Sequence, residues 1–295
     1  MEKKFNGVEA VSDLDLKLEK GDIYGFLGPN GAGKTTTIRM MIGLIKPDKG
    51  TVKIRGVDVW KEGLDVRKNI GYLPERVSFY GNLTVHENLD FLCKMKESSK
   101  GCVKELLKDF KLEVHSDKKC RNLSKGMNQR LGIAQTLIGD PDLVILDEPT
   151  AGLDPNIRRW VKEKIISLKE SGKTIFISSH VLSEVQELCD KVGILSDGKM
   201  LVEDDIETLS KKLSLKDRLE LQLEPVDKAL DLVRGVKYIE RPRLEDGKLV
   251  LYCNGDMKME VIRKFLDESV DITNFSVKEP DLEEVFVRLT EGEEV

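Results

Sequence analysis

A glycine-rich stretch with a single lysine carries the clearest chemistry in this sequence. It reads Gly28-Pro29-Asn30-Gly31-Ala32-Gly33-Lys34-Thr35-Thr36 and fits the spacing G-x-x-x-x-G-K-[ST] at every fixed position. Backbone N–H groups of such a loop can wrap an anion, because glycine has no Cβ to block the approach. A short apolar run precedes the stretch and a helix-compatible run follows it, as in a phosphate-binding loop. We expect Lys34 to reach the β- and γ-phosphates and the Thr35 hydroxyl to bind Mg²⁺.

Two carboxylates, Asp147 and Glu148, directly follow the apolar run 143–146. A continuous apolar run is typical of a strand that is covered on both faces in a parallel sheet. Such sheets bind ligands at the carboxyl ends of their strands. We therefore expect Asp147 to hold Mg²⁺, directly or through water, and Glu148 to act as general base on the attacking water. The plainer alternative is a pair of solvated carboxylates that cap the next segment.

Strands that alternate with helices must position these groups, and this alternation indicates an α/β nucleotide-binding fold. The patterns predict strands over 8–18, 23–27, 51–54, 70–73, 143–146, 174–178, 192–195 and 200–202. Residues 76–140 are mainly helical in pattern. There, Thr84 and Glu87 match a capping box, and Ser124 is expected to cap a helix that ends before Pro141.

A second, smaller domain follows the charged run 203–218. Its predicted elements are strand 219–223, helix 226–233, strands 236–239 and 249–253, helix 259–266, strand 272–277 and helix 282–289. The order βαββαβ is that of a ferredoxin-like α+β sandwich. We therefore expect a nucleotide-binding domain over 1–210, with a helical subdomain over about 76–140, and an accessory domain over 215–295.

Composition limits the classes of function that the chain can serve. In its 295 residues, no apolar run approaches the roughly 20 residues that cross a bilayer, and no apolar signal segment follows Met1. The five cysteines are scattered without a C-x-x-C pair, which favours a reducing cytoplasm. The net charge is −5 with basic and acidic residues interspersed, which argues against a nucleic-acid partner.

The segment Leu123-Ser124-Lys125-Gly126-Met127 resembles the signature motif of ATP-binding-cassette (ABC) ATPases, which usually reads LSGGQ. It stands about twenty residues before the paired carboxylates. The resemblance implies that Ser124 and Gly126 contact the γ-phosphate of ATP, and Lys125 and Met127 replace two of the usual residues. The helix that starts there would also direct its dipole at the phosphate.

Further positions match the same family and take their roles from it. The resemblance implies that Phe5 stacks on adenine, that Asp154 belongs to a loop crossing to the partner subunit, and that His180 contacts the γ-phosphate and the attacking water. Glu75 stands where the family usually has a glutamine that faces Mg²⁺ and water. The matching positions cover about residues 5–205. They imply an ABC cassette with a RecA-like core, an antiparallel β subdomain and a helical subdomain.

The tail 278–286 and the segment 71–80 resemble a subgroup of ABC ATPases that serve exporters and ABC-2-type permeases. The resemblance implies a subunit that hydrolyses ATP with Mg²⁺, forms a homodimer or pairs with a similar ATPase subunit, and drives separate integral-membrane permease subunits. Such a subunit would lie in the cytoplasm, on the inner face of the cell membrane. Usual family members carry a further strand ahead of the adenine-stacking aromatic.

Two other classes of function compete with this interpretation. One is a soluble ABC ATPase of translation or DNA metabolism, but such proteins usually have two cassettes or a long coiled-coil insertion, and this sequence has neither. The other is a nucleotide-gated binding module without turnover. Glu148 and His180 argue against the module, whereas Glu75, in place of the usual glutamine, leaves it open.

The role implied for Phe5 leads to a first prediction. Because the ring would stack on adenine through its face, Phe5→Ala should weaken ATP binding by on the order of 1 kcal/mol. Phe5→Tyr and Phe5→Trp serve as controls and should bind ATP like the parent in a titration with a fluorescent ATP analogue. Unchanged affinity of Phe5→Ala would make Phe5 a packing residue only.

Overall fold

The chain divides into two compact units in the computed structural model. The structure describes residues 1–61, 63–99, 101–205, 208–209 and 216–278. The first unit spans Met1–Asp205 and the second Ile206–Val295. The first unit holds two clusters of buried apolar residues and the second holds a cluster of its own. The phosphate loop, the paired carboxylates and the signature segment all belong to the first unit.

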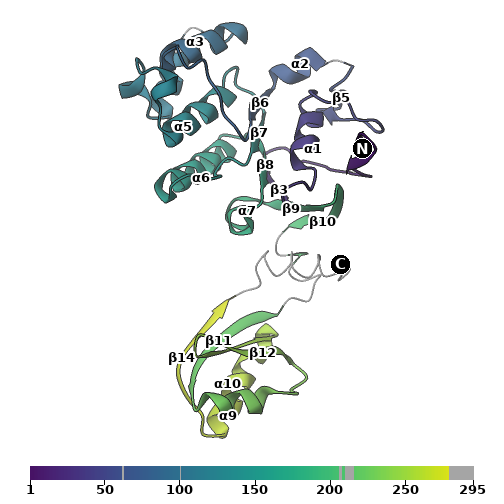
Figure 1. Ribbon diagram of the computed structural model, residues 1–295, viewed down its shortest axis with the longest axis vertical. Coiled ribbons are helices and arrows are strands. Elements are labelled where there is room, and N and C mark those ends of the chain that lie inside the picture. Colours follow the sequence, from purple (N-terminus) through teal and green to yellow (C-terminus); the bar gives the residue numbers. More distant parts are fainter. Residues whose placement is uncertain (62, 100, 206–207, 210–215, 279–295) are drawn as a thin grey trace. The chain divides into compact units, whose positions relative to one another are not determined.

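A six-stranded sheet forms the centre of the first unit (Figure 1). The strand order is β10-β9-β3-β8-β7-β6, and neighbours run parallel except for the edge hairpin β9–β10. The bounds are Ile23–Leu27 (β3), Ile70–Leu73 (β6), Leu143–Asp147 (β7), Thr174–Ser179 (β8), Lys191–Ser196 (β9) and Lys199–Asp205 (β10). The predicted parallel sheet and its terminal hairpin are confirmed.

Helices cover both faces of this sheet, which explains its continuous apolar strands. Val144 and Leu146 of β7 belong to the core that also holds residues of α6 (Pro155–Glu170), whereas Ile145 belongs to the core with α1 (Lys34–Met41). The short helices α2 (Gly63–Lys68) and α7 (Leu182–Leu188) complete the described helices around the sheet. Since β3, β8 and β7 are parallel neighbours, the phosphate loop and the two carboxylates leave the sheet at the same edge.

The helical region contains α3 (Val85–Met95), α4 (Cys102–Asp109) and α5 (Lys125–Thr136). Both predicted caps are confirmed. The Thr84 hydroxyl accepts a hydrogen bond from the Glu87 N–H at 3.1 Å, and the Glu87 carboxylate accepts one from the Thr84 N–H at 2.7 Å. The Ser124 hydroxyl accepts a hydrogen bond from the Met127 N–H at 3.3 Å and so fixes the start of α5.

The amino-terminal antiparallel region differs from the prediction. β1 (Lys3–Phe5) and β2 (Val8–Val11) form a hairpin through Asn6 and Gly7, which both have positive φ, as a tight hairpin turn requires. The strand predicted over 8–18 was wrong beyond Val11, because Asp13 adopts a left-handed φ of 45° that interrupts the extended run. The strand predicted over 51–54 is confined to β4 (Lys53–Ile54), which pairs with β5 (Val57–Asp58).

The second unit is a ferredoxin-like sandwich, as predicted. Its elements are β11 (Asp217–Glu224), α9 (Val226–Val233), β12 (Ile239–Glu245), β13 (Lys248–Cys253), α10 (Lys258–Asp267) and β14 (Asp271–Lys278). The strands are antiparallel in the order β12-β13-β11-β14. The strand predicted over 236–239 was misplaced, because a turn after Gly235 bonds the Ile239 N–H to the Val236 carbonyl and β12 starts only there. The predicted helix 282–289 lies outside the described residues.

The capping box at α3 leads to a stability prediction. Thr84→Ala removes the hydroxyl that accepts from the Glu87 N–H and should cost about 1 kcal/mol of unfolding free energy. Urea denaturation followed by circular dichroism measures the loss. Thr51→Ala, at an exposed threonine outside any helix, is the matched control and should leave the midpoint unchanged. Equal losses in the two variants would contradict a specific role of the cap.

Candidate functional site

Two glycines let the phosphate loop lie directly against neighbouring backbone. A Cβ on Gly28 would lie 2.4 Å from the Leu195 carbonyl oxygen, and a Cβ on Gly33 would lie 2.4 Å from the Ala10 carbonyl oxygen. Gly33 also has a φ of +105° and stands at the N-cap of α1. Because α1 begins directly at Lys34, its unpaired first-turn N–H groups and the positive end of its dipole lie at the loop.

The Lys34 side chain is buried and folded back over the loop. Its ammonium group donates hydrogen bonds to the carbonyl oxygens of Gly28 at 2.6 Å and Pro29 at 3.2 Å. The same nitrogen lies 3.6 Å from Glu148 Oε1. The cation therefore stands between the phosphate loop and the carboxylates, where an anion that entered the loop would meet it.

Asp147 joins the ends of three neighbouring segments. Its carboxylate accepts a hydrogen bond from the Ser178 hydroxyl of β8 at 2.5 Å and from the Thr35 hydroxyl of α1 at 3.3 Å. Burial raises the pKa of the Asp147 carboxyl, and the nearby Glu148 and Glu75 carboxylates act in the same direction, against the two hydroxyl donors. A buried carboxylate beside a threonine hydroxyl is a set of hard oxygen donors, which suits Mg²⁺.

Glu148 and His180 face one another across the ends of β7 and β8. Glu148 Oε2 lies 2.8 Å from His180 Nδ1. The Glu148 backbone has a φ of 50°, and its N–H donates to the Ser178 carbonyl oxygen and hydroxyl. This bonding to β8 holds Glu148 in the left-handed conformation and directs its side chain toward His180 and Lys34.

A pocket of about 340 Å³ brings most of the expected site residues together. Its lining consists of Ala10, Pro29, Asn30, Gly31, Gly33, Lys34, Thr35, Thr36, Glu75, Glu148, Ala151 and His180. The exposed Glu75 thus reaches the site from the end of β6. Among the described residues there is no group of three or more His, Cys, Asp and Glu side chains that could hold a metal by themselves. Mg²⁺ usually binds through one or two carboxylates together with substrate phosphates, so the donor set fits that ion.

The expected phosphate contacts Ser124 and Gly126, and Asp154 of the loop expected to cross to the partner subunit, do not line this pocket. Ser124 caps α5, Gly126 packs so closely on α6 that a Cβ would lie 2.8 Å from the Ile157 side chain, and Asp154 caps α6 through the Ile157 N–H at 3.0 Å. Ser124 and Asp154 are exposed. Within one chain, Ser124 of the signature segment therefore lies at the surface and outside the pocket of the phosphate loop.

Phe5 also lies outside the pocket lining. It ends β1, its side chain is 42% exposed, and the Lys3 ammonium group lies 5.5 Å from its ring centroid. The ring is thus not part of the apolar core. Its exposed face is free to meet a flat ligand, but the geometry does not itself bring Phe5 to the phosphate loop.

Two polar contacts that shape the site belong to no sequence motif. Ser178 bonds Asp147 and also receives the Glu148 N–H, and only its place at the end of a predicted strand could have indicated this role. Lys125 donates hydrogen bonds to the carbonyl oxygens of Ala151 at 3.0 Å and Gly152 at 2.8 Å. It ties the signature helix to the loop after Glu148, and no sequence pattern signals such a contact between a side chain and distant backbone.

Burial of Asp147 leads to a pH prediction. Because the pKa of the folded-state carboxyl is raised, native Asp147 binds a proton more readily than the unfolded chain, and stability falls as pH rises above the unfolded value near 3.8. Asp147→Asn does not ionise. Its unfolding free energy relative to the parent should therefore increase with pH through that window and then become constant.

Thermal melts between pH 4 and 8 with EDTA and without nucleotide measure this dependence. Asp65→Asn is the control, because the Asp65 side chain is 89% exposed. Its difference from the parent should not vary with pH. A flat or falling difference for Asp147→Asn would show that the Asp147 carboxylate is not destabilised by burial.

Comparisons with known proteins give the site its context. A family model described as ABC transporter matches residues 11–151. The bacitracin transport ATP-binding protein BcrA of Bacillus licheniformis is 40% identical over 98% of this chain and 95% of its own length. The linearmycin resistance ATP-binding protein LnrL of Bacillus subtilis (strain 168) is 32% identical over 98% of this chain and 96% of its own length.

A solved structure agrees with these sequence relatives. It is a dimeric post-hydrolysis state of the ATP-binding cassette MJ0796 bound to ADP and Pi, with 25% identity and a TM-score of 0.64 over 70% of this chain and 95% of that chain. No helix within the described part of this chain is both long and apolar enough to span a membrane. The chain belongs to the ABC transporter family, as one of its ATP-binding, ATP-hydrolysing subunits.

Proposed function

We propose that this chain works as a homodimer in which two ATP molecules are each held between the phosphate loop of one subunit and the signature segment of the other. The observation that carries the proposal is the division of the site. Lys34, Glu148 and His180 share one pocket, whereas Ser124 and Asp154 lie exposed outside it. One subunit offers a nearly complete catalytic half, and the second half needs a partner.

The phosphate loop supplies the binding half. The backbone of residues Asn30–Thr36 surrounds the β- and γ-phosphates, and Lys34 exchanges its carbonyl acceptors on Gly28 and Pro29 for phosphate oxygens. The exchange needs no large movement, because the ammonium group already lies at the pocket wall. Phe5 stacks on adenine with its exposed ring face.

Thr35, Asp147 and Glu75 would hold Mg²⁺, since their oxygen atoms converge from α1, β7 and β6. When bound, this ion neutralises charge on the phosphates and orients the γ-phosphate for attack. Asp147 is fixed by Ser178 and needs little reorganisation to act. Glu75 places a carboxylate where the family usually has the neutral amide of glutamine. The added negative charge increases both the affinity of the site for a cation and its repulsion of phosphate.

Glu148 acts as the general base for the attacking water. Its carboxylate lies within hydrogen-bond reach of His180 and 3.6 Å from the Lys34 ammonium group. Glu148 therefore stands between His180, which would contact the γ-phosphate, and Lys34, which would bind it. His180 orients Glu148 and the water in the same contact. Since the Glu148 backbone is bonded to Ser178, the base keeps its position as phosphate is released.

The partner subunit supplies the signature half. The start of α5 would bring the Ser124 hydroxyl, the Gly126 N–H and the positive helix end to the γ-phosphate. Asp154 lies at the start of α6, beside the loop that Lys125 ties to α5. Movement of one segment is therefore transmitted to the other, which links phosphate contact to the subunit interface.

The wider role follows from the relatives. BcrA and LnrL are named for bacitracin transport and linearmycin resistance, and the segments 71–80 and 278–286 resemble ATPases that serve ABC-2-type permeases. We therefore infer that this chain powers an exporter of the ABC-2 type through separate membrane permease subunits. It would lie on the cytoplasmic face of the membrane. In this proposal, residues 1–210 form the ATPase domain and residues 215–295 form an accessory domain. The part of the helical subdomain over 76–110 would meet the permease.

A composite site predicts how variants of the catalytic base behave. Glu148→Gln should keep ATP affinity and lose hydrolysis by roughly 10²–10⁴-fold, the usual loss for a general base. With Mg²⁺ and saturating ATP, it should elute as a dimer in size-exclusion chromatography. Adding Ser124→Arg should abolish this dimer, while Ser99→Arg, at another exposed serine of the helical region, should retain it.

A mixture of two defective subunits tests the geometry directly. A heterodimer of Lys34→Ala and Ser124→Arg subunits has one site with both defects and one site with neither. Some ATP-dependent pairing should therefore return that neither variant shows alone. The composite-site mechanism fails if Glu148→Gln stays monomeric at saturating ATP, or if Ser124→Arg hydrolyses ATP normally as a monomer.

A further inference from the structure

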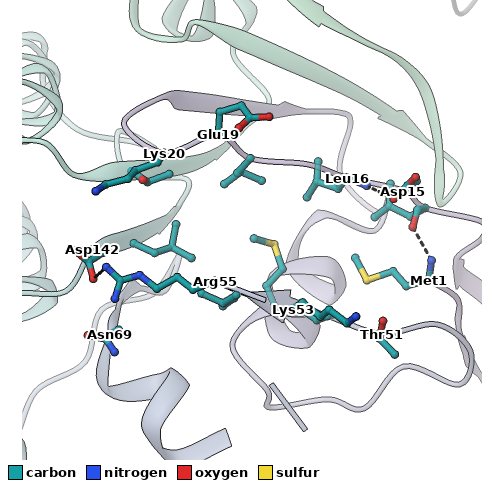
Figure 2. Close-up of a pocket in the computed structure, with 17 residues that line it drawn as sticks. Met1, Asp15, Leu16, Glu19, Lys20, Thr51, Lys53, Arg55, Asn69 and Asp142 are labelled. Carbon is teal, nitrogen blue, oxygen red and sulfur yellow. Dashed lines mark hydrogen bonds and ion pairs between the residues drawn. The ribbon is translucent and has the colours of Figure 1, made fainter. Parts of the chain in front are cut away.

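A pocket of about 370 Å³ at the amino ends of the central strands offers little chemistry of its own (Figure 2). Figure 2 shows Arg55 beside Asp142 at one end, where the two side chains form an ion pair. At the other end, the Met1 amino group donates to the Leu14 carbonyl oxygen at 2.5 Å. The described lining of this pocket contains neither cysteine nor histidine. A reactive pair of side chains that the proposed ATPase mechanism leaves unused lies instead in the helical region.

Two cysteines of the helical region contact one another through their sulfur atoms. Cys93 lies in the last turn of α3, and Cys102 is the first residue of α4. The Cys93 thiol donates a hydrogen bond to the Cys102 sulfur, and the two Sγ atoms lie 2.9 Å apart. Both cysteines carry free thiols. A disulfide bond is about 2.0 Å long, so the two sulfurs could bond after a movement of less than about 1 Å.

Backbone hydrogen bonds hold the two helix ends that carry these sulfurs. The Ser98 N–H donates to the Cys93 carbonyl oxygen at 2.9 Å and closes the end of α3. The Cys102 N–H donates to the Ser99 carbonyl oxygen at 3.3 Å, directly ahead of α4. Gly101, with a φ of +108°, stands at the N-cap of α4. The described residues on either side of position 100 therefore keep Cys93 and Cys102 within reach of each other.

The two sulfurs differ in burial, which gives them different roles. Cys93 is 5% exposed and belongs to one of the two apolar cores of the first unit, whereas Cys102 is only partly buried and packs against that core. Burial, together with the neighbouring Cys102, raises the pKa of the Cys93 thiol. An oxidant from solvent therefore reaches Cys102 first, and Cys93 stays protonated beside it. Redox-sensitive cysteines are typically accessible and adjacent to a second, resolving cysteine.

The other three cysteines have different surroundings. Cys120 and Cys253 are buried, and Cys189 is partly buried. Within the described residues, no sulfur hydrogen bond joins any of these three to another cysteine, and the Cys120 sulfur accepts from the Asn88 amide instead, at 3.1 Å. Burial raises the pKa of all three thiols, which keeps them in the less reactive protonated form. The contact between two thiols is therefore specific to Cys93 and Cys102.

We propose that Cys93 and Cys102 form a thiol pair that a hydroperoxide converts reversibly into an intramolecular disulfide. In the first step, the Cys102 thiolate attacks a peroxide oxygen, so that an S–O bond forms and the O–O bond breaks. The leaving hydroxide takes up the proton that the Cys102 thiol released. In the second step, the Cys93 sulfur attacks the sulfenic acid on Cys102, so that the S–S bond forms and the S–O bond breaks.

The proton of Cys93 passes to the hydroxide that leaves in this second step. With hydrogen peroxide, the two thiols together lose two electrons and two protons, and the peroxide is reduced to two molecules of water. A dithiol reductant reverses the change by thiol–disulfide exchange. In a reducing cytoplasm such a disulfide is transient and is typical of a redox sensor.

The disulfide would tie the last turn of α3 to the first residue of α4. Opening of the turn that bonds the Ser98 N–H to the Cys93 carbonyl oxygen would then be restrained. Neither cysteine is among the residues that line the phosphate pocket. This chemistry is therefore separate from that of the ATPase site.

Thiol mapping of the full-length chain tests the pair. The reduced chain is treated with hydrogen peroxide, its remaining thiols are blocked with iodoacetamide, and its peptides are identified by mass spectrometry. The disulfide between Cys93 and Cys102 should form at least about tenfold faster than any other cysteine is oxidised, because the two sulfurs are already in contact. Dithiothreitol should restore both thiols. Oxidation that yields no disulfide between Cys93 and Cys102 would overturn the proposal.

Three variants separate the roles of the two sulfurs. In Cys93→Ser the sulfenic acid on Cys102 has no resolving thiol, so dimedone should label Cys102 at least about tenfold more than in the parent. In Cys102→Ser the sulfur that meets the oxidant is gone, and dimedone should leave Cys93 unlabelled. Cys253→Ser is the matched control at a buried cysteine of the second unit, and it should form the disulfide like the parent. Equal labelling of Cys102 in the parent and in Cys93→Ser would contradict the resolving role of Cys93.

Amide hydrogen exchange measures the effect of the bond on the helix ends. In the oxidised parent, exchange at Ser98 should be about threefold or more slower than in the reduced parent, because the turn that protects this amide opens less often. Exchange in the second unit should be the same in both states. Unchanged exchange at Ser98 would show that the disulfide does not restrain the end of α3.

Discussion

The buried carboxyl group of Asp147 is the constraint around which the nucleotide-binding unit is arranged. A carboxylate taken out of water is costly unless donors and a cation compensate it, and burial here raises the pKa of this carboxyl. The compensation comes from the Ser178 hydroxyl on β8 and the Thr35 hydroxyl on α1. The ends of β7 and β8 and the start of α1 must therefore meet at one point. That point also holds the phosphate loop, so an arrangement suited to a buried acid is suited to a metal-bound phosphate.

The division of the site between the pocket and the surface underlies our proposal that hydrolysis depends on assembly. The phosphate loop, the base and the histidine lie on one edge of the sheet, and the signature serine caps a helix at the surface. Lys125 spans the distance between that helix and the loop after the base, through two backbone carbonyl groups. In the proposed dimer, contact of the partner's phosphate with α5 would reach the loop after Glu148 in the same subunit through these two bonds. Pairing of the subunits would then be coupled to turnover.

The sequence by itself determined the features that depend on local pattern. The spacing of residues 28–36, the apolar runs of β3, β7 and β8, and the caps at Thr84 and Ser124 each follow from neighbouring residues, and the structure has them where they were predicted. Local pattern could not predict where a strand begins or ends when the backbone conformation of a single residue or turn sets that boundary. Asp13 ends the predicted strand over 8–18 through a left-handed φ, and a turn after Gly235 delays β12. Only the tertiary structure could show that Ser178 holds Asp147 and that Lys125 reaches Ala151 and Gly152. Each of these contacts joins segments far apart in the chain, and their distance is fixed by the packing of the sheet and helices.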